Sequence, residues 1–244
     1  LLEQIVNTAI EKGINEICLL EHTHQYYEFE QVYKPISSFN DYQCKWLSRK
    51  MRGTVESYLR FIESAKEQDY PIKIKYGLEA CYIPKTEDLL ASILSKYEFD
   101  FITGAVHYID NWGFDHKLEF WNNVNVDNAY RRYYEIMSDL IETGLFNGLA
   151  HPDSIKCFNK YPSYDLIETY IKIAALVKKY NVYAEQSGGL ALNYNFPELG
   201  MNSVMLRVFK QGGVKIMTAS DAHKPEHTGA NIKELQQLVN NVQD

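Results

Sequence analysis

Six short apolar runs with the composition of β-strands alternate with helical patterns, and this alternation restricts the possible folds more than any other feature. In residues 164–180, for example, Leu166, Tyr170 and Ile173 share one helical face. Apolar strands that alternate with helices are typical of a parallel sheet covered by helices. The sequence therefore predicts an α/β fold, either an open doubly wound sheet or a closed barrel. The predicted strands are residues 15–20, 72–80, 100–106, 145–150, 181–186 and 213–219.

Composition limits the class of protein. The 244 residues suffice for one large α/β domain, and no Gly/Ser/Pro-rich linker divides them. A formal charge of −7 argues against a nucleic-acid-binding surface, which requires clustered Lys and Arg. The four cysteines lack C-x-x-C spacing, which predicts free thiols in a cytoplasmic protein. Neither a signal peptide nor a run near the ~18 apolar residues of a membrane helix is present.

Two segments depart from the regular alternation. Residues 1–13 have the apolar spacing of an amphipathic helix but do not begin with methionine, so we expect further residues upstream, including a whole strand. Residues 23–50 have no clean period and are rich in tyrosine. This second segment predicts a long loop over an active site.

Each predicted strand ends in a carboxylate, a histidine or both, which strand propensity does not require. In a parallel α/β protein the carboxyl ends of all strands lie on one face, where active sites form. We therefore expect these side chains to converge. They are Glu21 and His22, Glu79, His107, His151 and Asp153, Glu185, and Asp221 and His223.

Such a cluster predicts bound metal. Crowded histidines and carboxylates would repel as ions or stay unpaired when buried, and a cation removes both costs. Mixed nitrogen and oxygen ligands suit Zn, Mn or Fe. The ligands exceed what one ion needs, so we expect two or three divalent ions with Glu79 as a bridge. Each residue alone also has a structural alternative: Asp221 could cap a turn, and Glu185 could simply orient backbone.

Five stretches carry a family resemblance. They are ICLLEHTH, YGLEACYI, DFITGAVHYIDNWGFD, GLAHPDSIKCF and ASDAHKPEHTG, in this order along nearly the whole chain. The sequence resembles the PHP (polymerase and histidinol phosphatase) family of metal-dependent phosphoesterases, and the third and fourth stretches are most similar to its histidinol-phosphatase branch.

The resemblance implies a single domain over residues 1–244 with a distorted seven-stranded β/α (TIM-like) barrel. It also implies a trinuclear metal centre in which Glu79 bridges two ions. The other ligands would be Asp221 on the first ion, His107 and His151 on the second, and His22 and His223 on the third. The family's opening strand with a His-x-His motif is not in this sequence, and we expect it upstream. The stretch EQSGGLALNYN also lacks the basic residue usual in that branch, which bears on the substrate.

We therefore expect a phosphomonoesterase whose substrate is a small phosphate ester such as L-histidinol phosphate, in histidine biosynthesis. Metal centres of this kind activate water and hold the attacking and leaving oxygens. Asp153 would protonate the leaving group or stabilise a turn, and Lys156 would hold the phosphate or be solvated. His24, Tyr26 and Tyr27 would face the substrate or pack within the loop.

Two alternatives stay open at this point. A PHP-type nuclease would use similar ligands on a polynucleotide, against which the negative charge counts. A PHP scaffold without a complete metal site would serve in binding or regulation instead of catalysis. The oligomeric state and the identity of the metals are not readable from the sequence.

Overall fold

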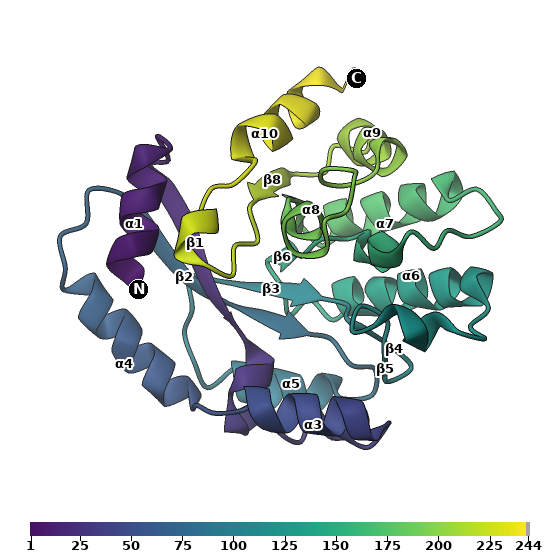
Figure 1. Cartoon of the computed structure of the whole chain (residues 1–244), viewed down its shortest axis with the longest axis horizontal. Coiled ribbons are helices and arrows are strands. Elements are labelled where there is room, and N and C mark those ends of the chain that lie inside the picture. The colour runs from purple at the N-terminus through teal and green to yellow at the C-terminus, as the bar shows by residue number, and fades with distance from the viewer. Residues whose placement is uncertain (243–244) are drawn as a thin grey trace.

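The computed structural model describes residues 1–242 and contains a six-stranded parallel sheet in the order β1-β2-β3-β6-β7-β8 (Figure 1). All six predicted strands are confirmed. The strands are β1 (Glu16–His22), β2 (Lys73–Cys81), β3 (Phe101–Ala105), β6 (Gly148–Leu149), β7 (Tyr183–Ser187) and β8 (Ile216–Ala219). A separate antiparallel pair consists of β4 (Tyr108–Ile109) and β5 (Trp112–Gly113).

Helices connect the strands, and α7 falls within the predicted helix 164–180, with Tyr170 and Ile173 buried. The longer helices are α1 (Leu2–Glu11), α3 (Asp41–Lys50), α4 (Val55–Lys66), α5 (Glu87–Leu94), α6 (Val126–Glu142), α7 (Ile167–Lys179), α9 (Ser203–Gln211) and α10 (Ile232–Asn241). The shorter ones are α2 (Lys34–Ser37), α8 (Gly189–Tyr194), η1 (Thr23–Gln25), η2 (Tyr27–Phe29), η3 (Leu118–Trp121), η4 (Ser154–Phe158) and η5 (Pro225–His227).

The sheet curls so that its two edges approach each other. The Nζ of Lys12, after α1, donates to the carbonyl oxygen of Thr228, after η5, at 2.6 Å. The rings of His22 on β1 and His223 after β8 stack with their centroids 5.6 Å apart. The α/β class is therefore confirmed as a curled parallel sheet, while a seventh strand stays a prediction.

Residues 23–50 differ from the predicted loop, because the segment ends in helix α3. Asn40 caps this helix by accepting a hydrogen bond from the backbone N–H of Gln43 at 2.8 Å. Of the helical residues only Gln43 and Leu47 are buried. One of these two is polar, so the sequence shows no apolar period here and the helix was missed.

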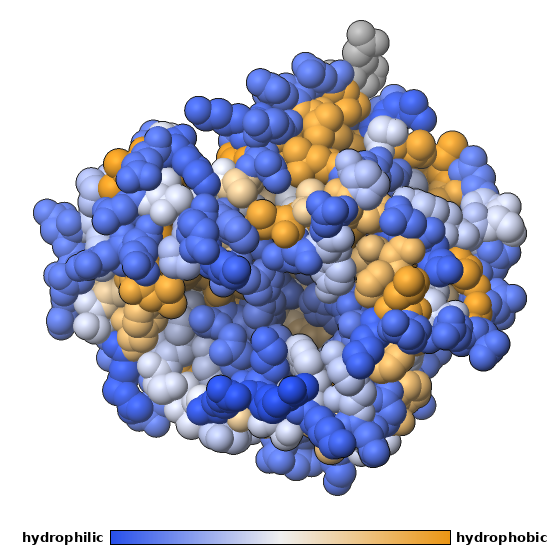
Figure 2. Space-filling view, viewed as in Figure 1, coloured by the Kyte–Doolittle hydropathy of each residue, from blue (hydrophilic) through white to orange (hydrophobic). Residues whose placement is uncertain are grey.

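Strand β2 shows how the fold presents a charged side chain at the sheet's carboxyl end. Leu78 and Ala80 are fully buried, while Glu79 between them points to the opposite face because strand side chains alternate. Glu79 and Cys81 line a cavity on that face. The space-filling view shows a mainly hydrophilic face with a hollow near its centre (Figure 2). Within residues 1–242, no helix is both long and apolar enough to cross a membrane.

Candidate metal centre

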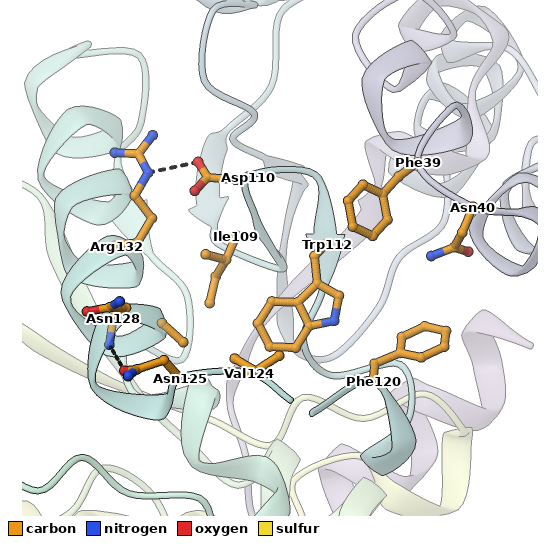
Figure 3. A pocket seen from close by; sticks show the side chains of 11 residues that line it. Phe39, Asn40, Ile109, Asp110, Trp112, Phe120, Val124, Asn125, Asn128 and Arg132 are labelled. Carbon is orange, nitrogen blue, oxygen red and sulfur yellow. Dashed lines mark hydrogen bonds and ion pairs between the residues drawn. The ribbon is translucent and has the colours of Figure 1, made fainter. Parts of the chain in front are cut away.

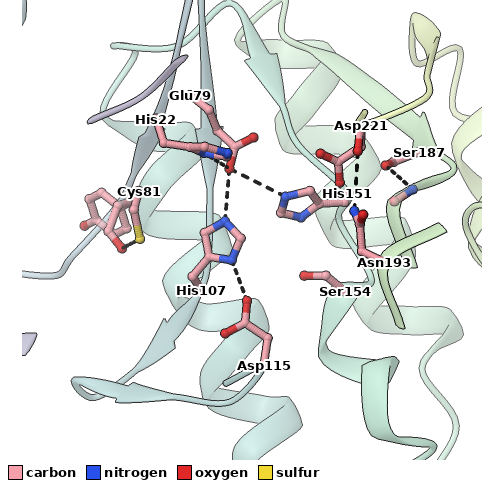
Figure 4. A network of polar contacts seen from close by, with 12 residues as sticks. His22, Glu79, Cys81, His107, Asp115, His151, Ser154, Ser187, Asn193 and Asp221 are labelled. Carbon is pink, nitrogen blue, oxygen red and sulfur yellow. Dashed lines mark hydrogen bonds and ion pairs between the residues drawn. The ribbon is translucent and has the colours of Figure 1, made fainter. Parts of the chain in front are cut away.

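The carboxyl ends of five strands and the turns that follow them supply the candidate ligands. His22 ends β1, and the parallel register pairs it directly with Glu79 of β2. His107 and His151 each come two residues after their strands, β3 and β6. Asp221 follows β8 at the same distance. The predicted convergence is thus observed for these five residues, and Figure 4 shows their side chains directed toward one another.

Three imidazoles surround one oxygen atom of Glu79. The Oε1 atom of Glu79 lies 3.0 Å from His107 Nε2, 3.4 Å from His22 Nδ1 and 3.7 Å from His151 Nε2. Glu79, His107 and His151 each offer one ligand atom, and these atoms lie within 4.8 Å of one another. One carboxylate oxygen with several imidazole nitrogens around it is a donor set that suits a divalent transition metal.

The opposite side of the His107 ring is held by Asp115. Its Oδ2 atom lies 2.8 Å from His107 Nδ1, and the carboxylate fixes that nitrogen as the protonated one. When the ring is neutral, the Nε2 atom, directed at Glu79, is then the nitrogen with a lone pair for a metal. Carboxylate–histidine–metal arrangements of this kind set both the tautomer and the orientation of the ring.

The electrostatics of the cluster favour added positive charge. Burial alone would raise the pKa of Glu79, but the charge of His22 and hydrogen bonds from the histidines lower it well below the usual value. Burial would lower the pKa of His22, His107 and His151, yet the neighbouring carboxylates raise each one. Burial also raises the pKa of Glu185 to about 8. Every shift in this group except that of Glu185 stabilises the charged form of its residue.

His151 provides a direct indication that something beyond the protein belongs here. Its Nδ1 atom is buried and has no hydrogen-bond partner among the described residues. Its backbone φ is +27°, in a region that non-glycine residues rarely adopt. Buried polar atoms are almost always paired, so the unpartnered Nδ1 is unusual. It belongs to the same ring whose Nε2 atom lies 3.7 Å from Glu79 Oε1. The residues present therefore fit a divalent cation.

Asp221 and His223 lie on the β8 side of the same cavity. Asp221 also has a positive φ, +51°, and its carboxylate occupies the space beside Gly189. A Cβ atom at Gly189 would lie 1.9 Å from Asp221 Oδ2, so only glycine leaves room for this carboxylate. His223 Nδ1 is 3.8 Å from Asp221 Oδ1 and 3.4 Å from Asn193 Nδ2. With His22, these two residues extend the cluster beyond the Glu79 triad.

Two further predicted residues, Asp153 and Lys156, belong to a separate buried network. The Nζ atom of Lys156 contacts Asp153 Oδ2 at 2.8 Å, Glu198 Oε2 at 2.6 Å and the carbonyl oxygen of Gly200 at 2.9 Å. The same Asp153 oxygen accepts a hydrogen bond from the backbone N–H of Asn202 at 2.7 Å. Neither side chain is among those that line the cavity around Glu79.

The two residues predicted to contact the substrate, His24 and Tyr26, lie in different surroundings. His24 lines the cavity and stacks on His22, with centroids 5.0 Å apart. Burial lowers the pKa of His24 to about 2, which keeps the ring neutral. Tyr26 is buried outside the cavity lining, with its ring stacked on Tyr58 at 6.0 Å, and Tyr27 is exposed.

Several cavity residues were not predicted from the sequence. Asp115 lies in the same stretch, DFITGAVHYIDNWGFD, as His107. Nothing in the sequence shows that the β4–β5 hairpin folds Asp115 back onto the His107 ring. Helical spacing could have found Tyr42, Trp46 and Lys50, had α3 been recognised as a helix.

Two of the cavities formed by the described residues are similar in size, and their linings differ in chemistry. The cavity around Glu79 has a volume of 530 Å³, within the range of small-molecule sites. The other, of 640 Å³, is lined by aromatic and amide side chains (Figure 3). Its charged groups, Arg132 and Asp110, already pair at 2.8 Å. The first cavity is the candidate site because it alone of these two holds the histidine and carboxylate cluster.

Fold and site together define a parallel α/β protein with a candidate divalent-metal centre at the carboxyl end of its sheet. A comparison with protein families matches residues 1–187 to the PHP domain, and the chain belongs to the PHP domain family. The family predicted from the five sequence motifs is thereby confirmed.

Similar proteins cover nearly the whole chain. A Deinococcus radiodurans protein named "Probable histidinol-phosphatase" is 25% identical over 98% of this chain and 86% of its own length. The crystal structure of the hisK protein of Listeria monocytogenes superposes with a TM-score of 0.80 at 18% identity, covering 96% of this chain and 93% of that one. A histidinol phosphate phosphatase from Lactococcus lactis, complexed with Zn, L-histidinol and phosphate, gives a TM-score of 0.74 at 21% identity, covering 99% and 87%.

Proposed function

We propose that this protein is a metal-dependent phosphomonoesterase that hydrolyses a small phosphate ester, with L-histidinol phosphate as the first candidate substrate. The observation that carries the proposal is the placement of His22, His107 and His151 around a single carboxylate oxygen of Glu79 inside a cavity. The names of its relatives, and the zinc, histidinol and phosphate in the Lactococcus structure, support the choice of substrate.

We further propose that two or three divalent ions, Zn, Mn or Fe, occupy the centre. Glu79, His107 and His151 would supply one group of metal ligands, and His22, Asp221 and His223 would supply further ones. Bound ions of this kind polarise phosphoryl oxygens and lower the pKa of coordinated water. The curled sheet supports the related proposal that residues 1–244 form one domain with most of a distorted seven-stranded barrel.

The protein's own residues prepare the cavity for that chemistry. Asp115 holds the His107 ring so that Nε2 points inward. Gly189 leaves space for the Asp221 carboxylate. His24, neutral and stacked on His22, gives the cavity a wall that a substrate can contact without adding charge. Asp153 as a proton donor and Lys156 as a phosphate ligand stay predictions, and their mutual ion pair supports a structural role.

The test loads the purified full chain with Mn²⁺ or Zn²⁺ and measures phosphate release from L-histidinol phosphate, together with metal content by mass spectrometry. We expect metal-dependent hydrolysis that is lost in Glu79→Gln and His107→Ala along with bound metal. Release of phosphate that is unchanged in both variants would show that the reaction does not use this centre.

A parallel assay with single-stranded DNA addresses the nuclease alternative. Among the described residues that line the cavity, Lys50 is the single Lys or Arg, against three carboxylates. A polynucleotide needs several cations along its path, so we expect no cleavage. DNA cleavage without phosphomonoester hydrolysis would replace the proposed function with that of a nuclease.

A further inference from the structure

One face of helix α3 lines the cavity with side chains that no metal chemistry requires. Tyr42, Trp46 and Lys50 follow one another at intervals of four residues, which places them on the same side of a helix. All three are among the residues that line the cavity around Glu79. This face of α3 thus contributes two aromatic rings and one ammonium group to the cavity wall.

The other side of α3 fixes the helix in place. Gln43 is fully buried, and its Nε2 atom donates to the carbonyl oxygens of Ile36 at 3.1 Å and Asn111 at 2.8 Å. Its Oε1 atom accepts from the backbone N–H of Gly113 at 3.0 Å. Leu47 is buried beside it. These bonds join α3 to the β4–β5 hairpin, so the cavity-facing side chains are held relative to Asp115.

Trp46 packs against two histidine rings at the edge of the metal cluster. Its ring centroid lies 4.8 Å from that of His24 and 4.9 Å from that of His116. His24 in turn stacks on the candidate ligand His22. Trp46 is half-buried by these contacts, and part of its surface lines the cavity. Tyr42 continues the wall, with its ring 5.6 Å from that of His116.

Lys50 supplies positive charge at the exposed end of this wall. Its side chain lies over the Trp46 ring, with Nζ 5.8 Å from the centroid. Because Glu79, Asp115 and Asp221 give the cavity negative charge, a phosphate dianion would be repelled on approach unless cations offset them. Lys50 provides one such offset at the entrance.

We propose that the cavity-facing side of α3 selects the substrate, a phosphate monoester whose alcohol carries a small planar ring. Trp46 and Tyr42 pack against the ring, and Lys50 attracts the phosphate group. The inference rests on the proposed function, because the ring lies next to Trp46 only when the phosphate is at the metal centre. It adds that the alcohol, and not the phosphate alone, is recognised.

The test compares 2-phenylethyl phosphate with hexyl phosphate, a ring-bearing and a ringless ester, on the metal-loaded full chain. We expect Trp46→Leu to lower the preference for the ring-bearing ester, as a ratio of kcat/KM, by about fivefold to tenfold through KM. Trp46→Phe keeps an aromatic face and should retain most of the preference. Phe39→Leu, which removes an aromatic ring from the second cavity, is the matched control and should change nothing.

Calorimetry with the non-hydrolysable 3-phenylpropylphosphonate and heptylphosphonate gives a second readout that needs no turnover. The same variants should lose affinity only for the ring-bearing ligand. Equal ratios in wild type and Trp46→Leu, with wild type active, would overturn the inference while leaving the phosphatase intact. A wild type that hydrolyses L-histidinol phosphate but neither binds nor hydrolyses either ester would overturn the inference alone. A wild type that hydrolyses none of the three phosphates would overturn the proposed function itself.

The contribution of Lys50 is tested through ionic strength. Lys50→Ala should lower kcat/KM for both esters by about threefold at low salt, and the difference should shrink at high salt because exposed charges are screened. Lys45→Ala removes the same charge from an exposed position elsewhere on α3 and is the control. Equal losses of kcat/KM in both variants would show that only the net charge of the protein matters and that the position of Lys50 does not.

Discussion

Two clusters of buried charge differ in how completely the protein satisfies them, although His151 of one and Asp153 of the other are only two residues apart. In the network around Lys156, the ammonium has Asp153, Glu198 and the carbonyl of Gly200 within 2.9 Å. In the cluster around Glu79, three imidazoles crowd one carboxylate oxygen and the group faces a cavity. The first cluster is complete without any added group, while the second leaves ligand atoms directed at open space.

The difference teaches that the type of residue at a strand end does not reveal its role. His151 and Asp153 are two residues apart in one turn, and both were predicted site residues. The structure leaves His151 Nδ1 without a partner among the described residues and gives Asp153 a lysine and a backbone N–H. A buried charge that is paired needs no further partner and is costly to break, whereas a buried ligand atom left unpaired indicates function.

The largest expected effect comes from Glu79→Gln, which removes the shared oxygen charge from the incomplete cluster. We expect phosphatase activity to fall by roughly 1,000-fold or more and bound metal to be lost, because a neutral amide cannot hold the cations. Activity assays and metal analysis measure both. Glu198→Gln makes the same chemical change in the complete cluster and should keep metal and turnover. Metal retention in Glu79→Gln would contradict the assignment.

Breaking the complete cluster should instead cost stability. Lys156→Met leaves Asp153 buried without its cation, and we expect the free energy of unfolding to fall by about 3 kcal/mol. The side chain of Lys156 is only 2% exposed, so solvent screening does little to reduce this cost. Urea denaturation measures the change, and Lys172→Met, at an exposed position on α7, is the control.

The Lys156→Met variant also distinguishes a structural role of this network from a catalytic one. If its role is structural, kcat of the folded Lys156→Met protein should stay within a factor of about three, since neither Lys156 nor Asp153 lines the cavity around Glu79. A loss of kcat with unchanged stability would restore the predicted roles of Lys156 in phosphate binding and Asp153 in proton transfer.

Much of the fold and part of the site were predictable because they depend on local pattern. Strand alternation and the parallel arrangement brought Glu79 and the histidines to one face, as expected from the apolar runs. The pairing of Asp115 with His107 was not predictable, since it depends on how the β4–β5 hairpin between them turns back. Helix α3 was missed because a hydrogen-bonded glutamine, Gln43, fills one of its two buried positions.

Asp115→Asn tests whether Asp115 holds His107 in place in the cluster around Glu79, and its expected effect is smaller. An amide can still contact His107 but does not hold its tautomer as a carboxylate does, so we expect metal affinity to fall by about 10-fold to 100-fold. Competition with a chelator measures the affinity. Asp110→Asn changes an aspartate in the same hairpin that pairs with Arg132 at the surface, and it should have no effect. Equal affinities in the two variants would remove Asp115 from the centre.

The smallest effect is the pH dependence of metal stabilisation. Burial would lower the pKa of His22, His107 and His151, but Glu79 and Asp115 raise these values above that of a free imidazole. In the metal-free protein the protonated histidines therefore stabilise the fold below a pH of about 6.5, and this stabilisation is lost as the pH rises through the raised values.

Metal binding has the opposite dependence, because ligand imidazoles must release their protons. The increase in melting temperature on adding Mn²⁺ or Zn²⁺ should thus grow from about pH 6 to about pH 8, by about 3 to 5 °C for each tenfold gain in affinity. Differential scanning fluorimetry with and without metal measures it. Glu79→Gln should show little increase at either pH. An increase that shrinks toward high pH would mean that the metal does not displace protons from these histidines, and the two clusters would then differ less than their geometry indicates.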